Sequence, residues 1–239
     1  MKKVDYEIVI PIYNEGINVL KVLRLFNKFL KYKIRVLLCY DFESDNIFQF
    51  KKLLNKFKFK VLLVKNPHRG PCYAIINGLK SGNSKCVIVY PADDHLNYKI
   101  LDKMYELHLN GSEIVVASRF IKGGSMKNCP LLKEIIVRLA SATLYFFSSI
   151  PVQDASNGFR LFSRKLLNLV KIESKVGFAY SLELLVKCHR LKMKISEIPA
   201  QWEERSEGQS RFKVLKWLPQ YIKWYIYGLS TTWLNKNKK

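Results

Sequence analysis

Acidic residues are scarce in this sequence. Only 19 aspartates and glutamates stand against 41 lysines and arginines, which gives a formal net charge of +22. Because this charge far exceeds what solubility needs, we expect an anionic partner: a phosphorylated substrate, an acidic lipid or a nucleic acid. The basic residues are spread along the chain without a recognised nucleic-acid-binding motif. We therefore expect no nucleic acid among the partners.

Cysteine is also sparse and unpatterned. The five cysteines have no metal-type spacing; they are Cys39, Cys72, Cys86, Cys129 and Cys188. An odd number without a framework excludes a disulfide scaffold and indicates reduced thiols in a cytosolic setting. The N-terminus moves directly into a strand pattern, so we expect no signal peptide and a cytoplasmic protein.

Uninterrupted apolar stretches are lacking near the C-terminus. Pro219 and Lys223 interrupt the aromatic segment 212–234, which argues against a spanning helix. Its basic residues share one helical face beside a broad aromatic surface, which favours a helix lying in a membrane interface. A core helix packed on the sheet is the alternative. We assign 212–239 as an amphipathic membrane-interface helix and tail, with 131–150 as a second candidate interfacial helix.

The regular pattern of the chain is an alternation of apolar strands and amphipathic helices. Strands are predicted at 7–12, 35–40, 59–64, 86–90 and 113–117, with helices at 17–30, 46–57, 71–80 and 98–109. This alternation predicts an α/β fold with a mostly parallel sheet covered by helices on both faces. Beyond residue 118 we expect helices at 131–150, 164–170 and 180–191, a short strand at 158–162 and an extended segment at 194–202.

The most informative motif is an apolar strand that ends in two carboxylates. Val87–Tyr90 leads through Pro-Ala into Asp93, Asp94 and His95. In open α/β sheets, ligands bind beyond the carboxyl ends of strands, where carboxylates can hold a divalent cation against a phosphate-bearing substrate. Capping of a helix that begins near Asn97 is the alternative role. The doublet alone leaves both roles open.

The end of the first strand, Pro11-Ile-Tyr13-Asn-Glu15, and the acidic doublet together resemble the inverting nucleotide-sugar glycosyltransferases of family two. Three later segments resemble the polyprenyl-phosphate sugar synthases within that family: Ser-Arg-Phe-Ile-Lys-Gly-Gly at 118–124, Asp-Ala-Ser-Asn-Gly-Phe-Arg at 154–160 and Arg-Ser-Glu-Gly-Gln-Ser-Arg at 205–211. The resemblance runs in order from about Glu7 to Arg211. It implies a GT-A (Rossmann-like) domain over 1–211, with a nucleotide-sugar-binding half at 1–118 and an acceptor half at 119–211.

The resemblance also assigns residues to the nucleotide. In the family, the Pro-x-Tyr-Asn-Glu turn contacts base and ribose, a carboxylate after the second strand bonds the base, and an arginine before a helix reaches a phosphate. The matching residues are Pro11, Ile12, Tyr13, Glu15, Asp41, Arg69 and Ala92. Pro11 ending a strand and Tyr13 as a half-buried aromatic are the alternative roles.

A divalent cation, Mg²⁺ or Mn²⁺, is implied as cofactor, with Asp93, Asp94 and His95 as candidate ligands. Pro91 stands where the family's Asp-x-Asp motif has its first aspartate, so either aspartate can be the ligand. One carboxylate plus two phosphate oxygens can still hold a hydrated ion.

The chemistry follows from the resemblance as a hypothesis. Asp93 or Asp94 through the metal, with Arg205 and Arg211, would stabilise the leaving diphosphate. Arg119 is a further catalytic candidate. A lipid-phosphate acceptor needs cations and no base; the candidates are Arg119, Lys133, Arg138 and Arg211. A sugar hydroxyl needs a base, for which Asp154 is the candidate, although Asp154 serves equally well to hold the turn at 157–160.

We therefore predict a hexosyltransferase that moves a sugar from a nucleotide-diphosphate donor to a polyprenyl- or dolichyl-type lipid phosphate on the cytoplasmic face of a membrane. The same fold acting on a hydroxyl of a growing surface glycan is the alternative. A non-catalytic nucleotide-binding relative and a nucleic-acid-binding protein are the remaining hypotheses.

Overall fold

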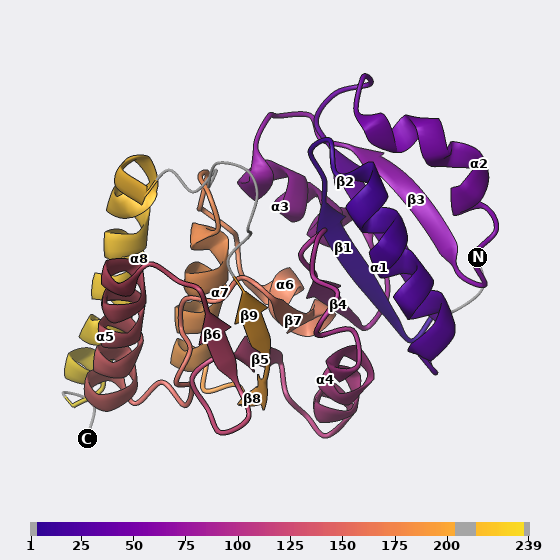
Figure 1. Cartoon of the computed structure of the whole chain (residues 1–239). Coiled ribbons are helices and arrows are strands. Elements are labelled where there is room, and N and C mark those ends of the chain that lie inside the picture. The colour runs from indigo at the N-terminus through magenta and orange to yellow at the C-terminus, as the bar shows by residue number, and fades with distance from the viewer. Residues whose placement is uncertain (1–3, 204–213, 237–239) are drawn as a thin grey trace.

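The computed structural model describes residues 4–203 and 214–236. Its main sheet has seven strands in the order β3-β2-β1-β4-β7-β5-β8, drawn in Figure 1. The strands are β1 (Tyr6–Pro11), β2 (Ile34–Tyr40), β3 (Lys60–Lys65), β4 (Cys86–Val89), β5 (Ile114–Ser118), β7 (Arg160–Ser163) and β8 (Ile195–Pro199). All pairings are parallel except those of β7, which runs antiparallel to β4 and β5. The predicted α/β class with a mostly parallel sheet is confirmed.

Helices cover both faces of this sheet. Their bounds are α1 (Gly16–Phe29), the 3-10 helix η1 (Asn46–Phe50), α2 (Lys51–Leu54), α3 (Pro71–Ser81), α4 (Ile100–Leu109), α5 (Leu131–Ser148), α6 (Arg164–Leu169), α7 (Ala179–Arg190) and α8 (Val214–Lys236). Successive strand residues point to opposite faces. Ile8 and Ile10 of β1 therefore pack with α1 and α4, whereas Val9 packs with α3 and α7. The continuously buried strand patterns arise from this two-sided cover.

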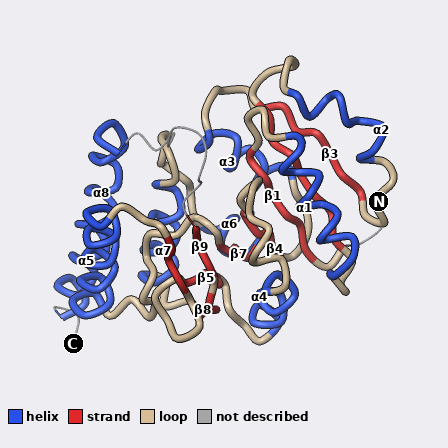
Figure 2. Tube along the Cα trace, in the orientation of Figure 1, coloured by secondary structure: helices blue, strands red, loops and turns tan. Residues whose placement is uncertain are grey.

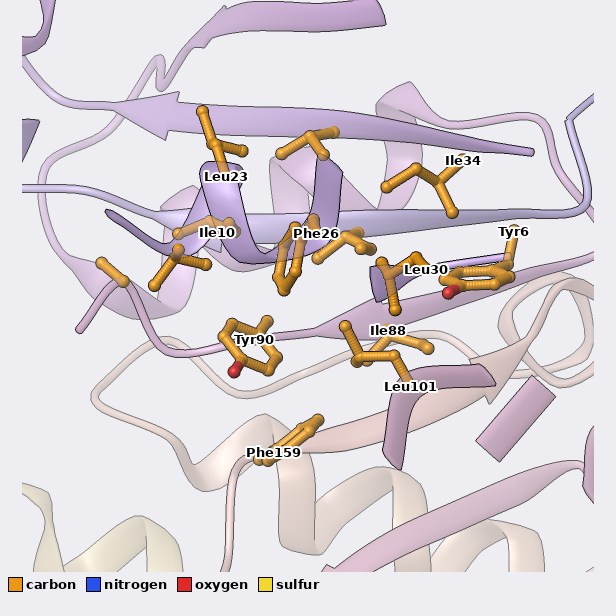
Figure 3. Packing of buried hydrophobic residues seen from close by; sticks show 14 of the residues in the cluster. Tyr6, Ile10, Leu23, Phe26, Leu30, Ile34, Ile88, Tyr90, Leu101 and Phe159 are labelled. Carbon is orange, nitrogen blue, oxygen red and sulfur yellow. The ribbon is translucent and has the colours of Figure 1, made fainter. Parts of the chain in front are cut away.

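The core beneath α1 includes Tyr90, which precedes the acidic motif in the sequence (Figure 3). The ring of Tyr90 lies edge-on to Phe26 and to Phe159, with centroid distances of 5.1 and 5.0 Å. Tyr90 is fully buried, yet its hydroxyl donates to the backbone carbonyl of Asp94 at 2.7 Å. Burial raises the pKa of Tyr90 well above its ordinary value, so the phenol stays a neutral donor. One core side chain thus fixes the loop that carries both carboxylates.

The reversed strand β7 brings the second half of the chain to the same edge as the first. Arg160, the first residue of β7, pairs with Val89 of β4 on one side and with Val116 of β5 on the other. Because β7 is antiparallel, the loop before it emerges where β4 and β5 end. The loops that follow β4, follow β5 and precede β7 therefore meet at one rim.

The differences from the expected elements are local. The helix expected at 46–57 is a 3-10 turn followed by the short α2. The extended segment expected at 194–202 divides into β8 and β9 (Gln201–Glu203), and β9 pairs with β6 (Ser125–Lys127) in a second, two-stranded sheet. Pairing of β6 with β9 joins distant segments, which local periodicity does not encode.

A group of three helices, α5, α7 and α8, forms one end of the molecule, as Figures 1 and 2 show. The C-terminal helix packs against the other two: Trp224 is buried and donates through Nε1 to Ser174, and Tyr225 shares a 2.6 Å hydrogen bond with Thr143 of α5. Trp217 is buried as well. These two tryptophans of the segment expected to lie in a membrane interface instead pack inside the protein. Within 4–203 and 214–236, no helix has the length and apolarity to cross a bilayer.

Candidate functional site

The residues predicted to bind the nucleotide and the metal lie at or after the carboxyl ends of four parallel strands. Backbone hydrogen bonds keep these ends level: Ile12 N–H donates to Cys39, Asn66 N–H to Tyr40, and Tyr90 N–H to Val9. Loops after β1, β2, β3 and β4 therefore open on one edge of the sheet. This is the edge at which open α/β sheets bind ligands.

Asp41, which follows β2, holds the start of α3. Its Oδ1 accepts from Asn66 Nδ2 at 2.7 Å and its Oδ2 accepts from the backbone N–H of Gly70 at 2.9 Å. Gly70 has φ +109°, a conformation that side-chain-bearing residues rarely adopt. A carboxylate has about four lone-pair positions, so Asp41 can accept a further bond from a base. Arg69 is exposed beside this turn.

Tyr13 and Phe42 form an aromatic pair on the rim. Their ring centroids are 5.1 Å apart at 84°, and Tyr13 is 48% exposed. A half-exposed ring held by a second ring offers a flat apolar surface for a nucleobase. Phe42 was not predicted from the sequence as part of the site. The only signal was its place directly after Asp41 at a strand end.

Hydrogen bonds join the loop after β1 to the loop after β2. Asn14, at φ 55°, donates its backbone N–H to Asp45 Oδ2 at 2.8 Å, and Asn46 Nδ2 donates to the Asn14 carbonyl. Asp45 also caps η1 by accepting from Ile47 N–H. Glu15 occupies the N-cap position of α1 without a side-chain cap bond. Of the other residues assigned to the nucleotide, Ile12 and Ala92 are buried and Pro11 is half-buried at the strand end.

The two carboxylates of the acidic loop have different surroundings. Asp94 Oδ1 accepts from the backbone N–H groups of Leu96 and Asn97, both at 2.9 Å, and its Oδ2 accepts from Asn97 Nδ2 at 2.6 Å. Burial, with the charge of Asp93, raises the pKa of Asp94 despite these bonds. Asp94 therefore holds the turn that leads towards α4, but it does not cap that helix, because α4 has Lys99 at its N-cap without a side-chain cap bond. Asp93 lies half-buried at the rim.

The side chains of this loop could supply part of the coordination shell of a divalent cation, with the substrate supplying the rest. Within residues 4–203 and 214–236, no three His, Cys, Asp or Glu side chains converge as a metal cage. Mg²⁺ sites that hold nucleotide phosphates commonly use only one or two carboxylates, with phosphate and water supplying the rest. His95 Nδ1 lies 3.1 Å from the Asp93 carbonyl, a contact that suits an Nδ1–H donor and leaves Nε2 as a lone-pair ligand. Asp93 and His95 therefore form a fitting partial set.

Arg119, which directly follows β5, and Asp154, in the loop before β7, form a buried ion pair. The guanidinium spans both carboxylate oxygens, with Nε–Oδ2 at 2.7 Å and Nη2–Oδ1 at 2.9 Å. Burial alone would raise the pKa of Asp154, but the bonds and charge of Arg119 outweigh it and hold that pKa below its usual range. Asp154 also accepts from the backbone N–H groups of Ser156 and Asn157. It thus holds the turn, while its role as a base stays a prediction.

Arg160 supports the same turn from below. Its side chain is fully buried and donates to the carbonyls of Ser181 at 2.6 Å and Ala155 at 2.7 Å. Burial lowers the pKa of Arg160 to about 10, with the charge of Asp154 acting in the opposite direction. The sequence motif contained Arg160, but its function as a buried support was not predicted.

Helix α5 brings two further cations to this region. The Arg138 guanidinium lies 4.4 Å from the centroid of Phe120, whose ring also has Arg119 at 5.0 Å. Lys133 lies 4.9 Å from the ring of Trp202 in β9. Of the four residues predicted to bind an acceptor phosphate, Arg119 and Arg138 therefore share the ring of Phe120, and Lys133 lies over a second ring. The fourth, Arg211, and the catalytic candidate Arg205 lie outside the described residues.

Comparisons with known proteins agree with this geometry. The family model described as "Glycosyl transferase family 2" matches residues 7–170. The dolichol-phosphate mannosyltransferase of Pyrococcus furiosus is 25% identical over 96% of this chain and 70% of its own length. The polyprenol monophosphomannose synthase of Mycolicibacterium smegmatis is 24% identical over 59% of this chain and 57% of its own, and the dolichyl-phosphate beta-glucosyltransferase of Saccharomyces cerevisiae is 22% identical over 85% and 68%.

A solved structure shares the fold. Glucosyl-3-phosphoglycerate synthase from Mycobacterium tuberculosis, in complex with Mn²⁺, uridine diphosphate and glucosyl-3-phosphoglycerate, superposes with a TM-score of 0.68 at 14% identity, covering 94% of this chain and 80% of that one. The same enzyme is also known with Mn²⁺, UDP-glucose and phosphoglyceric acid, at a TM-score of 0.66. The similarity establishes the GT-A-like architecture that the sequence resemblance implied.

Proposed function

Because the chain belongs to glycosyl transferase family 2, we propose that it is an inverting hexosyltransferase that moves a sugar from a nucleotide diphosphate to a lipid phosphate. Residues 1–118 would bind the donor and residues 119–211 the acceptor. The observation that carries the choice of acceptor is the arrangement of Arg119, Lys133 and Arg138 around Phe120 and Trp202.

The donor half supplies the contacts that a nucleotide needs. Tyr13 and Phe42 would receive the base, and Asp41 would accept a hydrogen bond from it. The diphosphate would lie between Arg69, at the start of α3, and Asp93. Helix α3 has eleven residues and begins at Pro71, which has no N–H; no side chain caps this helix start, which therefore favours an anion.

Asp93 and His95 would hold a divalent cation, Mg²⁺ or Mn²⁺, with phosphate oxygens completing its shell. When bound, the cation supplies charge neutralisation for the departing diphosphate. Asp94 would act on the shape of the loop, since its carboxylate already accepts three hydrogen bonds. Arg205 and Arg211, the other candidates for binding phosphate, belong to the segment joining β9 and α8.

The acceptor half fits a phosphate better than a hydroxyl. A lipid phosphate is an anion before it attacks, so it requires cations and no base. Arg119 directs Nε and Nη2 at Asp154, and within the described residues its Nη1 donates no hydrogen bond. Asp154, whose pKa lies below its usual range, is a weak base already engaged by Arg119. A surface-glycan hydroxyl as acceptor would need that carboxylate to be available.

Several observations support a membrane surface as the place of action. A polyprenyl chain is confined to a bilayer, and the net charge of +22 favours anionic headgroups. The relatives from Pyrococcus and Mycolicibacterium are named for dolichol and polyprenol phosphates. We propose peripheral association at the cytoplasmic face.

Product analysis tests the proposal. The full chain is incubated with Mn²⁺, labelled GDP- or UDP-linked hexoses, and either a polyprenyl phosphate in detergent or soluble sugar acceptors. We expect label in the organic phase as an acid-labile lipid phosphate sugar. Transfer only to the soluble sugars would select the hydroxyl acceptor, and the absence of transfer and donor hydrolysis would favour a non-catalytic nucleotide binder.

A further inference from the structure

One buried amide side chain joins the acidic loop to the second half of the chain. Asn97 is 5% exposed. Its Oδ1 accepts from the backbone N–H of Gln201 at 2.8 Å, and its Nδ2 donates to the Gln201 carbonyl at 2.7 Å. Two residues of paired antiparallel strands exchange hydrogen bonds in the same way. The Asn97 side chain therefore acts as a strand neighbour for a residue that is 104 positions away.

The same amide also bonds the acidic loop. Asn97 Nδ2 donates to Asp94 Oδ2 at 2.6 Å, and Asp94 Oδ1 accepts from the Asn97 backbone N–H at 2.9 Å. An amide nitrogen carries two hydrogens, so Asp94 and Gln201 together use both of them. An aspartate at position 97 would keep the acceptor, lose both donated bonds and place a second carboxylate against Asp94. These bonds therefore require an amide at this position.

Strand β9 carries the link onwards to the basic residues of the acceptor half. Trp202 lies in β9, and its ring has Lys133 of α5 at 4.9 Å. β9 pairs with β6 in the two-stranded sheet (Figure 1). Directly before β9, the Ala200 N–H donates to the carbonyl of Ser118, the residue that precedes Arg119, at 2.8 Å. A shift of β9 would therefore displace the ring that Lys133 contacts.

We propose that Asn97 is a positioning residue for sugar transfer: it fixes β9, and through Trp202 the surroundings of Lys133, relative to the acidic loop. This inference rests on the proposed function, in which Asp93 faces the donor diphosphate and Lys133 the acceptor phosphate. An inverting transfer needs the attacking and leaving groups aligned on opposite sides of the sugar carbon. The link between the two loops would therefore act on the rate of transfer, while the nucleotide site keeps its own contacts.

Hydrogen exchange of the full chain without ligand tests the link itself. N97D is compared with N77D, a matched control, because Asn77 Nδ2 also donates to a backbone carbonyl, that of Lys65, at 2.9 Å. In N97D we expect exchange about tenfold faster at 125–127 and 201–203, the two paired strands, because the Gln201 carbonyl loses its donor. N77D should exchange there as the wild type does. Wild-type exchange of both strands in folded N97D would overturn the proposal.

The double variant D94N/N97D separates the turn from the link. Exchanging the two side chains restores an amide-to-carboxylate bond within the loop, but the Gln201 carbonyl still has no amide donor. We expect the melting temperature, measured by circular dichroism, to recover towards that of the wild type while β9 continues to exchange fast. If N97D is unfolded, N97S takes its place, because serine also removes the amide and adds no charge.

Transfer kinetics test the positioning role on the same proteins, with Mn²⁺, GDP- or UDP-linked hexoses and polyprenyl phosphate in detergent. We expect kcat to fall about tenfold in N97D and to stay low in D94N/N97D. Calorimetric affinity for GDP and UDP with Mn²⁺ should change less than about twofold, since the nucleotide contacts are intact. N77D should match the wild type in both measurements.

A wild-type kcat in N97D would overturn the positioning role. Recovery of kcat together with the melting temperature in D94N/N97D would do so as well, because Asn97 would then serve only its own turn. No transfer by the wild type would refute the proposed function and with it the positioning role. Hydrogen exchange would in that case still decide whether Asn97 holds β9.

Discussion

Arg119 and Asp154 are joined three times: the backbone N–H of Arg119 donates to Asp154 Oδ2 at 3.0 Å, and its guanidinium donates to both carboxylate oxygens. The side chain of Asp154 is fully buried and that of Arg119 is 9% exposed. The pair therefore fixes the direction of the guanidinium at the rim while keeping the carboxylate ionised.

Replacement of Asp154 by asparagine should cost stability because it leaves Arg119 buried without a counter-charge. We expect a loss of about 3 kcal/mol in the free energy of unfolding, measured by urea titration. The control is Glu134→Gln, whose ion pair with Arg138 is solvent-exposed and should change stability by less than about 1 kcal/mol. Equal effects of the two variants would contradict the buried pair.

Replacing the two carboxylates after β4 should have different effects: Asp93 should matter for activity and Asp94 for stability. Asp93→Asn should lower kcat/KM at least about 100-fold, because it weakens the proposed hold on the diphosphate, with little change in Tm. Asp94→Asn should lower the free energy of unfolding by about 1 kcal/mol through its turn hydrogen bonds. Steady-state kinetics over a Mn²⁺ titration, with thermal melting of both variants, decides this. Full activity of both variants would place the metal site elsewhere.

The basic residues of α5 should affect the use of the acceptor and should not affect the binding of the nucleotide. Arg138→Met and Lys133→Met should each reduce kcat/KM for a lipid phosphate about tenfold, since each removes one charge from the phosphate's surroundings. Calorimetric binding of the nucleoside diphosphate should stay as in the wild type. Arg24→Met, an exposed arginine on α1, is the matched control. A change in nucleotide affinity for the α5 variants would instead assign these cations to the donor.

Protonation of Glu7 at low pH should lower the free energy of unfolding. This buried carboxylate accepts from Ser84 and pairs with Arg35 and Arg164. Burial would raise the pKa of Glu7, but these bonds and charges outweigh it and lower the pKa. The stabilisation is therefore fully present above the unfolded pKa of about 4.3 and is lost as pH falls through the lower folded value.

Glu7→Gln should accordingly flatten the fall in stability below about pH 4.5 and cost about 3 kcal/mol near neutrality. Urea titrations at a series of pH values measure both effects. Glu43→Gln is the control: its pair with Lys65 is exposed, with 60% of each side chain accessible. The same pH slope in wild type and Glu7→Gln would show that another group controls acid unfolding.

Much of this architecture was predictable from local pattern. Apolar strands and amphipathic helices alternate as the sequence predicts, because each element's periodicity follows from the face it buries. The Asp45 cap and the rim position of Asp41 were likewise predictable. Predictions were less complete where distant residues decide the outcome. The pairing of β7 between β4 and β5, the burial of Arg160 and the contact between Tyr13 and Phe42 all join segments that no local window contains.

The position of the aromatic C-terminal helix was also not predictable from local sequence. Its composition is shared by interface helices and by core helices, because tryptophan suits both places. The neighbours of Trp224, namely Ser174 and the helix α7, decide between them. The segment of α5 was singled out from the sequence as a candidate interfacial helix, and its packing shows which side faces outward.

The antiparallel strand β7 brings loops from two parts of the chain to the same edge of the sheet. Arg160 starts β7 between Val89 and Val116, so the proposed donor-binding and acceptor-binding loops come from separate stretches of chain and adjoin each other. If these assignments hold, changes confined to α5 and its connections would alter which molecule receives the sugar, while the loops proposed to bind the nucleotide would stay as they are. Diversification of acceptors within such a scaffold needs no redesign of its activated substrate.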